Sequence, residues 1–239
     1  MAIFEHDGAR LHYDVEGDGF PILVIAPGGM RSANDVWANA PWNPRTALTH
    51  RYQVIGMDQR NAGASTAPVS AADGWSTYAA DQLALLDHLG IGECHVVGMC
   101  IGGPYIFGLL MSAHDRFRSA VLLQPVGIDD NRDAFIEMFD GWVDEIGPAH
   151  PEAGPDDWAA FRQNMWGGEF VLTATREQVA DGETPLLVLM GDDLYHPQST
   201  SREIASLAPR ATFVERWKDD EVLAETDSTI KRFLAEHSP

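Results

Sequence analysis

The fold of this chain is decided by the stretch His95-Val96-Val97-Gly98-Met99-Cys100-Ile101-Gly102-Gly103-Pro104-Tyr105. Its first residues favour a β-strand, and the residues after Cys100 favour a helix. A strand that turns directly into a helix brings the two backbones close together, so the residues two positions from the turn must be small. Gly98 and Gly102 meet this need. The turn residue, Cys100, then points out of the fold at the N-terminus of the helix.

Two physical effects favour a thiolate at Cys100. The helix that we expect to begin at Ile101 presents free backbone N–H groups and the positive end of its dipole. Cysteines at helix N-termini have lowered pKa values, and the thiolate is the nucleophilic form. The alternative is a buried cysteine that serves as a small apolar residue. We interpret Cys100 as a nucleophile because the strand, the turn and the helix occur together.

This pattern resembles the nucleophile elbow of the α/β-hydrolase family, with Cys100 where serine is usual. Residues 58–65, Asp-Gln-Arg-Asn-Ala-Gly-Ala-Ser, resemble the family's Asp-x-Arg-Gly-x-Gly-x-Ser loop, which we interpret as mainly structural. The resemblance covers nearly the whole chain and implies an α/β-hydrolase fold.

A glycine-rich loop follows the apolar run at residues 22–26, which is typical of a strand buried on both faces. It reads Pro27-Gly28-Gly29-Met30, where the family usually has His-Gly-x. The resemblance implies that this loop supplies one N–H group of an oxyanion hole, from Gly29 or Met30, and that Ile101 supplies the other. We favour Gly29 over an ordinary glycine-rich turn.

The order of the elements predicts one α/β domain with an insertion. Asp7-Gly8 between two strand-like segments predicts an N-terminal β-hairpin. Strands then alternate with helices, which predicts a mostly parallel, twisted sheet with helices on both faces. The alternation stops over residues 127–183, where the resemblance implies a helical cap. We therefore expect a core domain at residues 1–126 and 184–239 and a cap insertion at 127–183.

The expected cap is rich in aromatic side chains. They are Phe135, Phe139, Trp142, Trp158, Phe161, Trp166 and Phe170. Aromatic stripes are most often core, but an insertion this small cannot bury so many rings within itself. We expect a lid over a mostly apolar pocket and place Met30, Phe139, Trp142 and Trp166 around the substrate.

A candidate acid follows the apolar run 185–190. The sequence continues Gly191-Asp192-Asp193-Leu194-Tyr195-His196-Pro197, whereas the family pattern is Gly-x-x-Asp-x-x-x-Pro. One residue is therefore missing between the glycine and the acid. Spacing from the proline selects Asp193, which we prefer; closeness to the strand selects Asp192. A plain turn-forming role remains the alternative for either aspartate.

The general-base histidine of the family is missing from its usual place after the last strand. Val222 occupies that position, and the only later histidine, His237, lies two residues from the end of the chain. His196 is the best substitute because it shares a loop with Asp193 at the same end of the sheet as Cys100. The alternative is a histidine that only packs the loop.

The composition of the chain limits the classes of molecule that it can bind. The formal net charge of −20 argues against nucleic acids and anionic membranes. No signal peptide or membrane-spanning run is evident, so we expect a cytoplasmic protein. The cysteines, Cys94 and Cys100, lie at opposite ends of one expected strand, which excludes a disulfide between them. We expect no metal and no organic cofactor, and a small-molecule substrate; the choice between a monomer and a homodimer stays open.

The sequence thus favours an enzyme that cleaves an ester, thioester or lactone of a small, largely apolar substrate through Cys100. Because the base is not at its usual place, two alternatives stay open. One is a non-hydrolytic acyltransferase, lyase or isomerase on the same scaffold. The other is a ligand-binding protein that has lost turnover.

Overall fold

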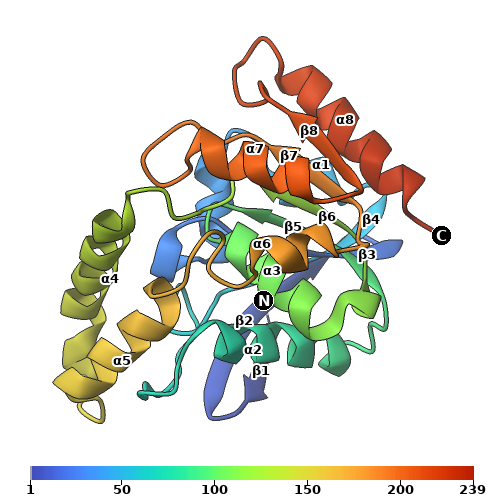
Figure 1. The fold of residues 1–239 in the computed structure, drawn as a ribbon. Helices are drawn as coiled ribbons and strands as arrows, with labels where there is room; N and C mark the ends of the chain where they lie inside the picture. Colours follow the sequence, from blue (N-terminus) through green and yellow to red (C-terminus); the bar gives the residue numbers. More distant parts are fainter. Residues whose placement is uncertain (1) are drawn as a thin grey trace.

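A computed structural model describes residues 2–239, and within them one eight-stranded sheet has the order β1-β2-β4-β3-β5-β6-β7-β8 (Figure 1). The strands are β1 (Ala2–His6), β2 (Ala9–Glu16), β3 (Phe20–Ile25), β4 (Tyr52–Met57), β5 (Cys94–Met99), β6 (Phe117–Leu123), β7 (Leu186–Leu189) and β8 (Ala211–Val214). β2 pairs antiparallel with β1 and β4, and the remaining pairings are parallel. The predicted mostly parallel sheet with an N-terminal hairpin is confirmed.

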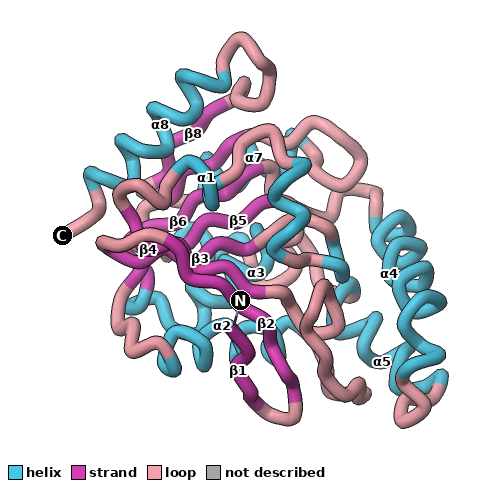
Figure 2. Tube along the Cα trace, turned by 180° about the vertical axis from the view of Figure 1, so that it is seen from behind, coloured by secondary structure: helices cyan, strands magenta, loops and turns pink. Residues whose placement is uncertain are grey.

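Helices cover both faces of this sheet (Figures 1 and 2). The α-helices are α1 (Pro44–Ala47), α2 (Trp75–His88), α3 (Gly102–Ala113), α4 (Arg132–Ile146), α5 (Pro155–Trp166), α6 (Arg176–Ala180), α7 (Gln198–Leu207) and α8 (Leu223–Glu236). Short 3-10 helices are η1 (Gly29–Arg31), η2 (Asn34–Asn39), η3 (His114–Arg116) and η4 (Gly147–Ala149). No helix in residues 2–239 combines the length and the apolar character needed to cross a membrane.

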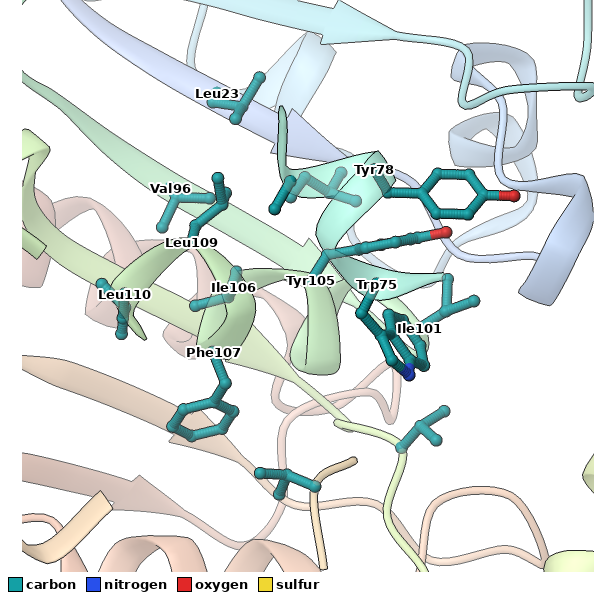
Figure 3. Close-up of a cluster of buried hydrophobic side chains, with 14 of the residues drawn as sticks. Leu23, Trp75, Tyr78, Val96, Ile101, Tyr105, Ile106, Phe107, Leu109 and Leu110 are labelled. Atoms are coloured by element: carbon teal, nitrogen blue, oxygen red, sulfur yellow. The ribbon is translucent and has the colours of Figure 1, made fainter. Parts of the chain in front are cut away.

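The central strands separate two hydrophobic cores, one on each face of the sheet. Along β3, Ile22 and Val24 face one core while Leu23 and Ile25 face the other, as the two-residue period of a strand requires. The first core holds α2, α3 and α7, and Figure 3 shows side chains of α3 packed against the sheet within it. The second holds residues of α8 together with three tryptophans, Trp37, Trp42 and Trp217. Burial on both faces explains why these strands read as continuous apolar runs.

The close approach of β5 and α3 has the geometry that the sequence predicts. A Cβ atom on Gly98 would lie 2.8 Å from the carbonyl oxygen of Gly102, and one on Gly102 would lie 3.0 Å from the carbonyl oxygen of Ile25. Gly103 is equally confined, because its Cβ would lie 2.6 Å from Pro125. Glycine is therefore required on both sides of the turn.

Helices α4 and α5 lie together at one side of the molecule, between β6 and β7 in the chain (Figures 1 and 2). Polar contacts fix the pair to the rest of the fold. The Arg31 guanidinium binds the Glu145 carboxylate of α4 at 2.6 Å, and the Trp75 indole N–H donates to the carbonyl of Met165 at 2.6 Å. The later helix α6 instead contacts α7.

We expect Gly98→Ala to lower the free energy of unfolding by about 1–3 kcal/mol, because overpacking against backbone cannot relax by a rotamer change. Urea denaturation monitored by tryptophan fluorescence measures this. Gly141→Ala is the matched control: it lies within α4 and a Cβ there meets nothing within 4 Å, so alanine should stabilise the helix by up to about 1 kcal/mol. Equal midpoints and slopes for both variants would contradict the packing argument.

Candidate active site

Cys100 lies at the carboxyl edge of the sheet and lines a cavity of about 240 Å³. Its φ of +60° is the left-handed conformation of a sharp strand–helix turn. Backbone hydrogen bonds hold it there: its N–H donates to Leu123 at 3.0 Å, and its carbonyl accepts from Gly103 and Val126 at 3.0 and 3.1 Å. The residues around the cavity are Gly28, Gly29, Cys100, Ile101, Val126, Phe135, Met138, Trp166, Tyr195 and His196.

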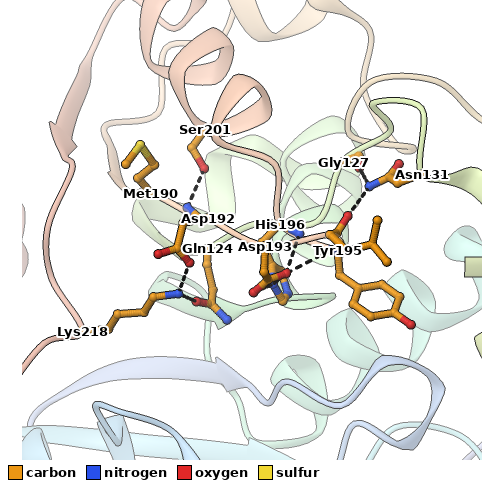
Figure 4. Close-up of polar contacts among 12 residues, drawn as sticks. Gln124, Gly127, Asn131, Met190, Asp192, Asp193, Tyr195, His196, Ser201 and Lys218 are labelled. Carbon is orange, nitrogen blue, oxygen red and sulfur yellow. Dashed lines mark hydrogen bonds and ion pairs between the residues drawn. The ribbon is translucent and has the colours of Figure 1, made fainter. Parts of the chain in front are cut away.

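Asp193 and His196 form one tight turn in the loop between β7 and α7 (Figure 4). The Nδ1 atom of His196 lies 2.7 and 2.8 Å from the two carboxylate oxygens of Asp193. Oδ1 of Asp193 also accepts the backbone N–H groups of Tyr195 and His196 at 3.0 and 3.1 Å. Because the carboxylate binds Nδ1, the tautomer is fixed and Nε2 is the nitrogen left to exchange a proton.

His196 and Cys100 interact as a base with an acidic thiol. Burial alone would lower the pKa of His196, but the nearby Cys100 thiol group, and then the Asp193 carboxylate that is hydrogen-bonded to Nδ1, raise it above its usual value. Burial alone would raise the pKa of Cys100, but His196 and the backbone N–H groups of Gly28 and Ile101 bring it below its usual value. Nε2 of His196 is buried and has no hydrogen bond of ordinary length and angle. Each group therefore favours the charged form of the other.

Backbone N–H groups converge on the same sulfur. Those of Gly28 and Ile101 help to lower the pKa of Cys100, and Gly29, the donor expected from sequence, also lines the cavity. Gly28 and Gly29 both have positive φ, at 119° and 59°. The glycine-rich loop therefore turns its backbone toward Cys100, and sequence reasoning missed Gly28 because it counted from the family pattern.

Of the four side chains expected around the substrate, Trp166 lines this cavity and the other three lie elsewhere. Met30, Phe139 and Trp142 are each at most 1% exposed and belong to the core. The ring of Phe139 packs against Trp142 and Phe161 instead. The insertion thus buries part of its aromatic set between α4 and α5.

Met138, Val126 and Tyr195 line the cavity without having been expected there from sequence, and Phe135, one of the aromatic residues of the expected lid, lines it as well. Phe135 and Met138 are spaced by three residues on α4, so they share one face of that helix. The ring of Phe135 stacks on Trp166 with centroids 4.8 Å apart. The spacing of Phe135 and Met138 in the sequence indicates that they share a face of α4, but it does not indicate which face of the helix points to Cys100.

The two aspartates of the acid loop have different partners. Asp193 holds His196, whereas the Asp192 carboxylate accepts a hydrogen bond from Lys218 (Figure 4). The structure thus brings Cys100, His196 and Asp193 to one site and leaves Asp192 outside it.

Neither of the other positions considered for a base supplies one. Val222 occupies the N-cap position of α8 and has no titratable side chain. The ring of His237 packs on Phe233 with centroids 4.8 Å apart, and the neighbouring Ser238 hydroxyl lies 3.0 Å from Nε2 of His95. Since His95 stands near the start of β5, the C-terminal residues lie at the opposite end of that strand from Cys100.

A larger hollow of about 540 Å³ opens at the opposite edge of the sheet. It lies between the end of α3, at Met111 and His114, and the start of β7, at Leu186. No cysteine or serine is among its described lining residues. No group of metal-binding side chains occurs within residues 2–239 either. The smaller cavity at Cys100 is therefore the candidate active site.

Comparison with known proteins agrees with the fold. Residues 21–164 match the family described as alpha/beta hydrolase fold. RutD of Azorhizobium caulinodans, which carries the name of a carbamate hydrolase, is 33% identical over 122 residues, which cover 50% of this chain and 43% of that protein. RutD of Caulobacter vibrioides is 24% identical over 89% of this chain and 88% of its own length. A variant of the meta-cleavage product hydrolase CumD from Pseudomonas fluorescens superposes with a TM-score of 0.73, at 20% identity and 98% coverage of both chains.

We expect iodoacetamide to alkylate Cys100 at a pH below the ordinary thiol pKa of about 8.5, because the lowered pKa of Cys100 keeps the thiolate at lower pH. His196→Gln should move the midpoint of the alkylation rate up in pH, since the imidazolium no longer favours the thiolate. Mass spectrometry of the labelled peptides measures the alkylation rates of Cys100 and Cys94 in the same sample.

Cys94 is the internal control. It is fully buried and burial raises the pKa of its thiol to about 12, so it should stay unlabelled in the folded protein. An unchanged midpoint in His196→Gln would show that His196 does not act on Cys100.

Proposed function

Because the chain belongs to the α/β-hydrolase fold family, we propose that it is a hydrolase that cleaves a carboxylic ester, thioester or lactone through Cys100. The observation that carries the proposal is the arrangement of Cys100, His196 and Asp193. A thiol with a lowered pKa lies against a histidine that a carboxylate holds by its other nitrogen. This is the arrangement of a nucleophile, a base and an orienting acid.

In the first step, the Cys100 thiolate adds to the carbonyl carbon of the substrate. The oxyanion that forms accepts hydrogen bonds from the backbone N–H groups of Ile101 and of Gly28 or Gly29, which line the cavity beside the sulfur. The carbonyl then re-forms and the bond to the leaving oxygen or sulfur breaks. Nε2 of His196 gives its proton to that atom, and a thioester on Cys100 remains.

In the second step, the neutral imidazole of His196 takes a proton from a water molecule that attacks the thioester. Collapse of the second oxyanion expels the Cys100 thiolate and releases the carboxylic acid. Asp193 stabilises the imidazolium in both steps, since it stays hydrogen-bonded to Nδ1. A base at this position supports hydrolysis over a protein that has lost turnover.

The volume and the lining of the cavity favour a substrate with a small, uncharged acyl group. A cavity of 150 Å³ holds benzene, so about 240 Å³ accommodates an acyl group somewhat larger than a single ring. Apart from Cys100 and His196, the lining consists of glycine, aliphatic and aromatic residues and Met138. No lysine or arginine among the described residues lines it to bind a carboxylate on the substrate.

We expect Cys100→Ala to lose turnover of p-nitrophenyl acetate, and Cys100→Ser to lose nearly all of it, because an alcohol is a far weaker nucleophile at the same base. His196→Gln should lower kcat by about 100-fold or more, the usual scale for general acid–base catalysis. Stopped-flow or steady-state release of p-nitrophenol measures this. His114→Gln, at an exposed histidine that pairs with Asp115, is the control and should keep full activity; full activity in Cys100→Ala would end the covalent mechanism.

We expect Met138→Ala to change which acyl chain is preferred. Met138 lines the cavity, and its sulfur would lie 2.4 Å from a Cβ on Gly29, so truncation opens space beside the oxyanion loop. The ratio of kcat/KM for p-nitrophenyl hexanoate to that for the acetate should rise by about tenfold.

Phe139→Ala is the control for the Met138 variant because it removes the next side chain of α4 from the core instead. It should lower the free energy of unfolding by about 3–5 kcal/mol and leave the ratio unchanged. A changed ratio in Phe139→Ala and an unchanged one in Met138→Ala would contradict the assignment of the cavity wall.

A further inference from the structure

The segment after β8, where the family pattern places a histidine, is firmly packed. Trp217 is 1% exposed, and its indole N–H donates to the carbonyl of Met190 at 2.8 Å. The carbonyl of Trp217 accepts the Thr226 hydroxyl of α8 at 2.8 Å. The backbone that carries the next residue, Lys218, is therefore fixed to both β7 and α8.

Lys218 joins three loops at the carboxyl edge of the sheet (Figure 4). Its ammonium group donates to the Asp192 carboxylate of the acid loop and, at 3.1 Å, to Oε1 of Gln124. Gln124 follows β6 in a left-handed conformation with φ of 39°, and its N–H donates to Leu189 of β7 at 2.8 Å. Lys218 itself follows β8, so one cation spans the ends of three adjacent strands.

Asp192, one of the two residues that Lys218 binds, belongs to the loop that carries the proposed base, His196. Asp192 precedes Asp193, which holds His196. On its other side, Gly191 has no room for a side chain, because a Cβ there would lie 2.4 Å from the Cβ of His196. A movement of Asp192 would therefore move both Gly191 and Asp193, each of which contacts His196.

We infer that Lys218 is a positioning residue for the active site: by holding Asp192 and Gln124 together, it fixes the acid loop so that Asp193 presents His196 to Cys100. The inference rests on the proposed catalytic role of His196. Lys218 has no part in the chemistry, and its side chain does not line the cavity.

The test compares Lys218→Met with Lys231→Met. Lys231 is the only other lysine in the sequence and also pairs with an aspartate, Asp227, at 2.7 Å on α8. Lys218→Met should lower kcat for p-nitrophenyl acetate about five- to tenfold, with KM within about twofold, since a part-exposed pair and a small misplacement of a base have effects of this size. Lys218→Arg should restore most of the loss, and Lys231→Met should change neither constant.

A second variant separates positioning from charge. Asp192→Ala removes an anion from the loop that carries Asp193 and His196, so charge alone would move the midpoint of Cys100 alkylation to lower pH. Loss of positioning weakens the contact between His196 and Cys100 and should move it to higher pH, as in Lys218→Met. In the double variant Lys218→Met/Asp192→Ala the losses should not add, because both act through one contact.

Three results would overturn the inference: a downward shift in Asp192→Ala, recovery of activity in the double variant, or equal effects of Lys218→Met and Lys231→Met. Thermal melts accompany each variant, and Asp192→Ala, at a half-exposed side chain, keeps the test open if Lys218→Met does not fold. Alkylation of Cys100 needs no substrate. A shift in alkylation without any ester turnover would therefore support Lys218 while contradicting the proposed hydrolysis.

Discussion

The structure depends on one steric constraint, the contact between the end of β5 and the start of α3. The missing side chains of Gly98 and Gly102 allow the two backbones to meet, and Cys100 between them must adopt φ of +60°. That conformation costs about 1 kcal/mol or more for a residue with a Cβ. It persists because Leu123, Gly103 and Val126 bind its backbone on both sides. The same contact directs the sulfur toward the N–H groups at the start of α3, so packing and electrostatics favour the thiolate together.

The acid and the base of the candidate site occupy a single turn of four residues. In the usual family arrangement they come from loops after two different strands, and their relative position depends on how the sheet twists. Here Asp193 binds both the backbone N–H and the ring of His196. Their geometry is therefore local, and what the fold has to supply is the orientation of the whole turn toward Cys100. Contacts outside the turn provide it: Gly191 against His196, the Asn131 amide on the carbonyl of Leu194 at 2.7 Å, and Lys218 on Asp192.

Sequence reasoning reached the features whose physics is local. Apolar runs predicted the buried strands, and paired glycines around Cys100 predicted the elbow, because both follow from neighbouring residues. The choice of Asp193 also rested on spacing within one loop. Sequence reasoning could not predict that Phe135 and Met138 rather than Phe139 and Trp142 line the cavity. All four residues lie on α4, and only the docking angle of that helix selects among them. Nor could sequence reasoning predict that Gly28 would point its N–H at the sulfur, or that Lys218 would engage Asp192, because these contacts join segments that are distant in the chain.

A cysteine in place of serine fits a site whose base comes from the acid loop. Serine has to be deprotonated in the transition state, which requires Nε2 within hydrogen-bond reach of the hydroxyl at that moment. A thiol with a lowered pKa reaches its nucleophilic form more readily. In the proposed mechanism His196 stabilises the thiolate by charge, an interaction that tolerates a longer and less linear contact. The absence of an ordinary hydrogen bond at Nε2 is compatible with that role. In the proposed mechanism, exact placement of His196 matters most for proton transfer to the leaving group and from water. The packing of the acid loop would act on the rate at these two steps.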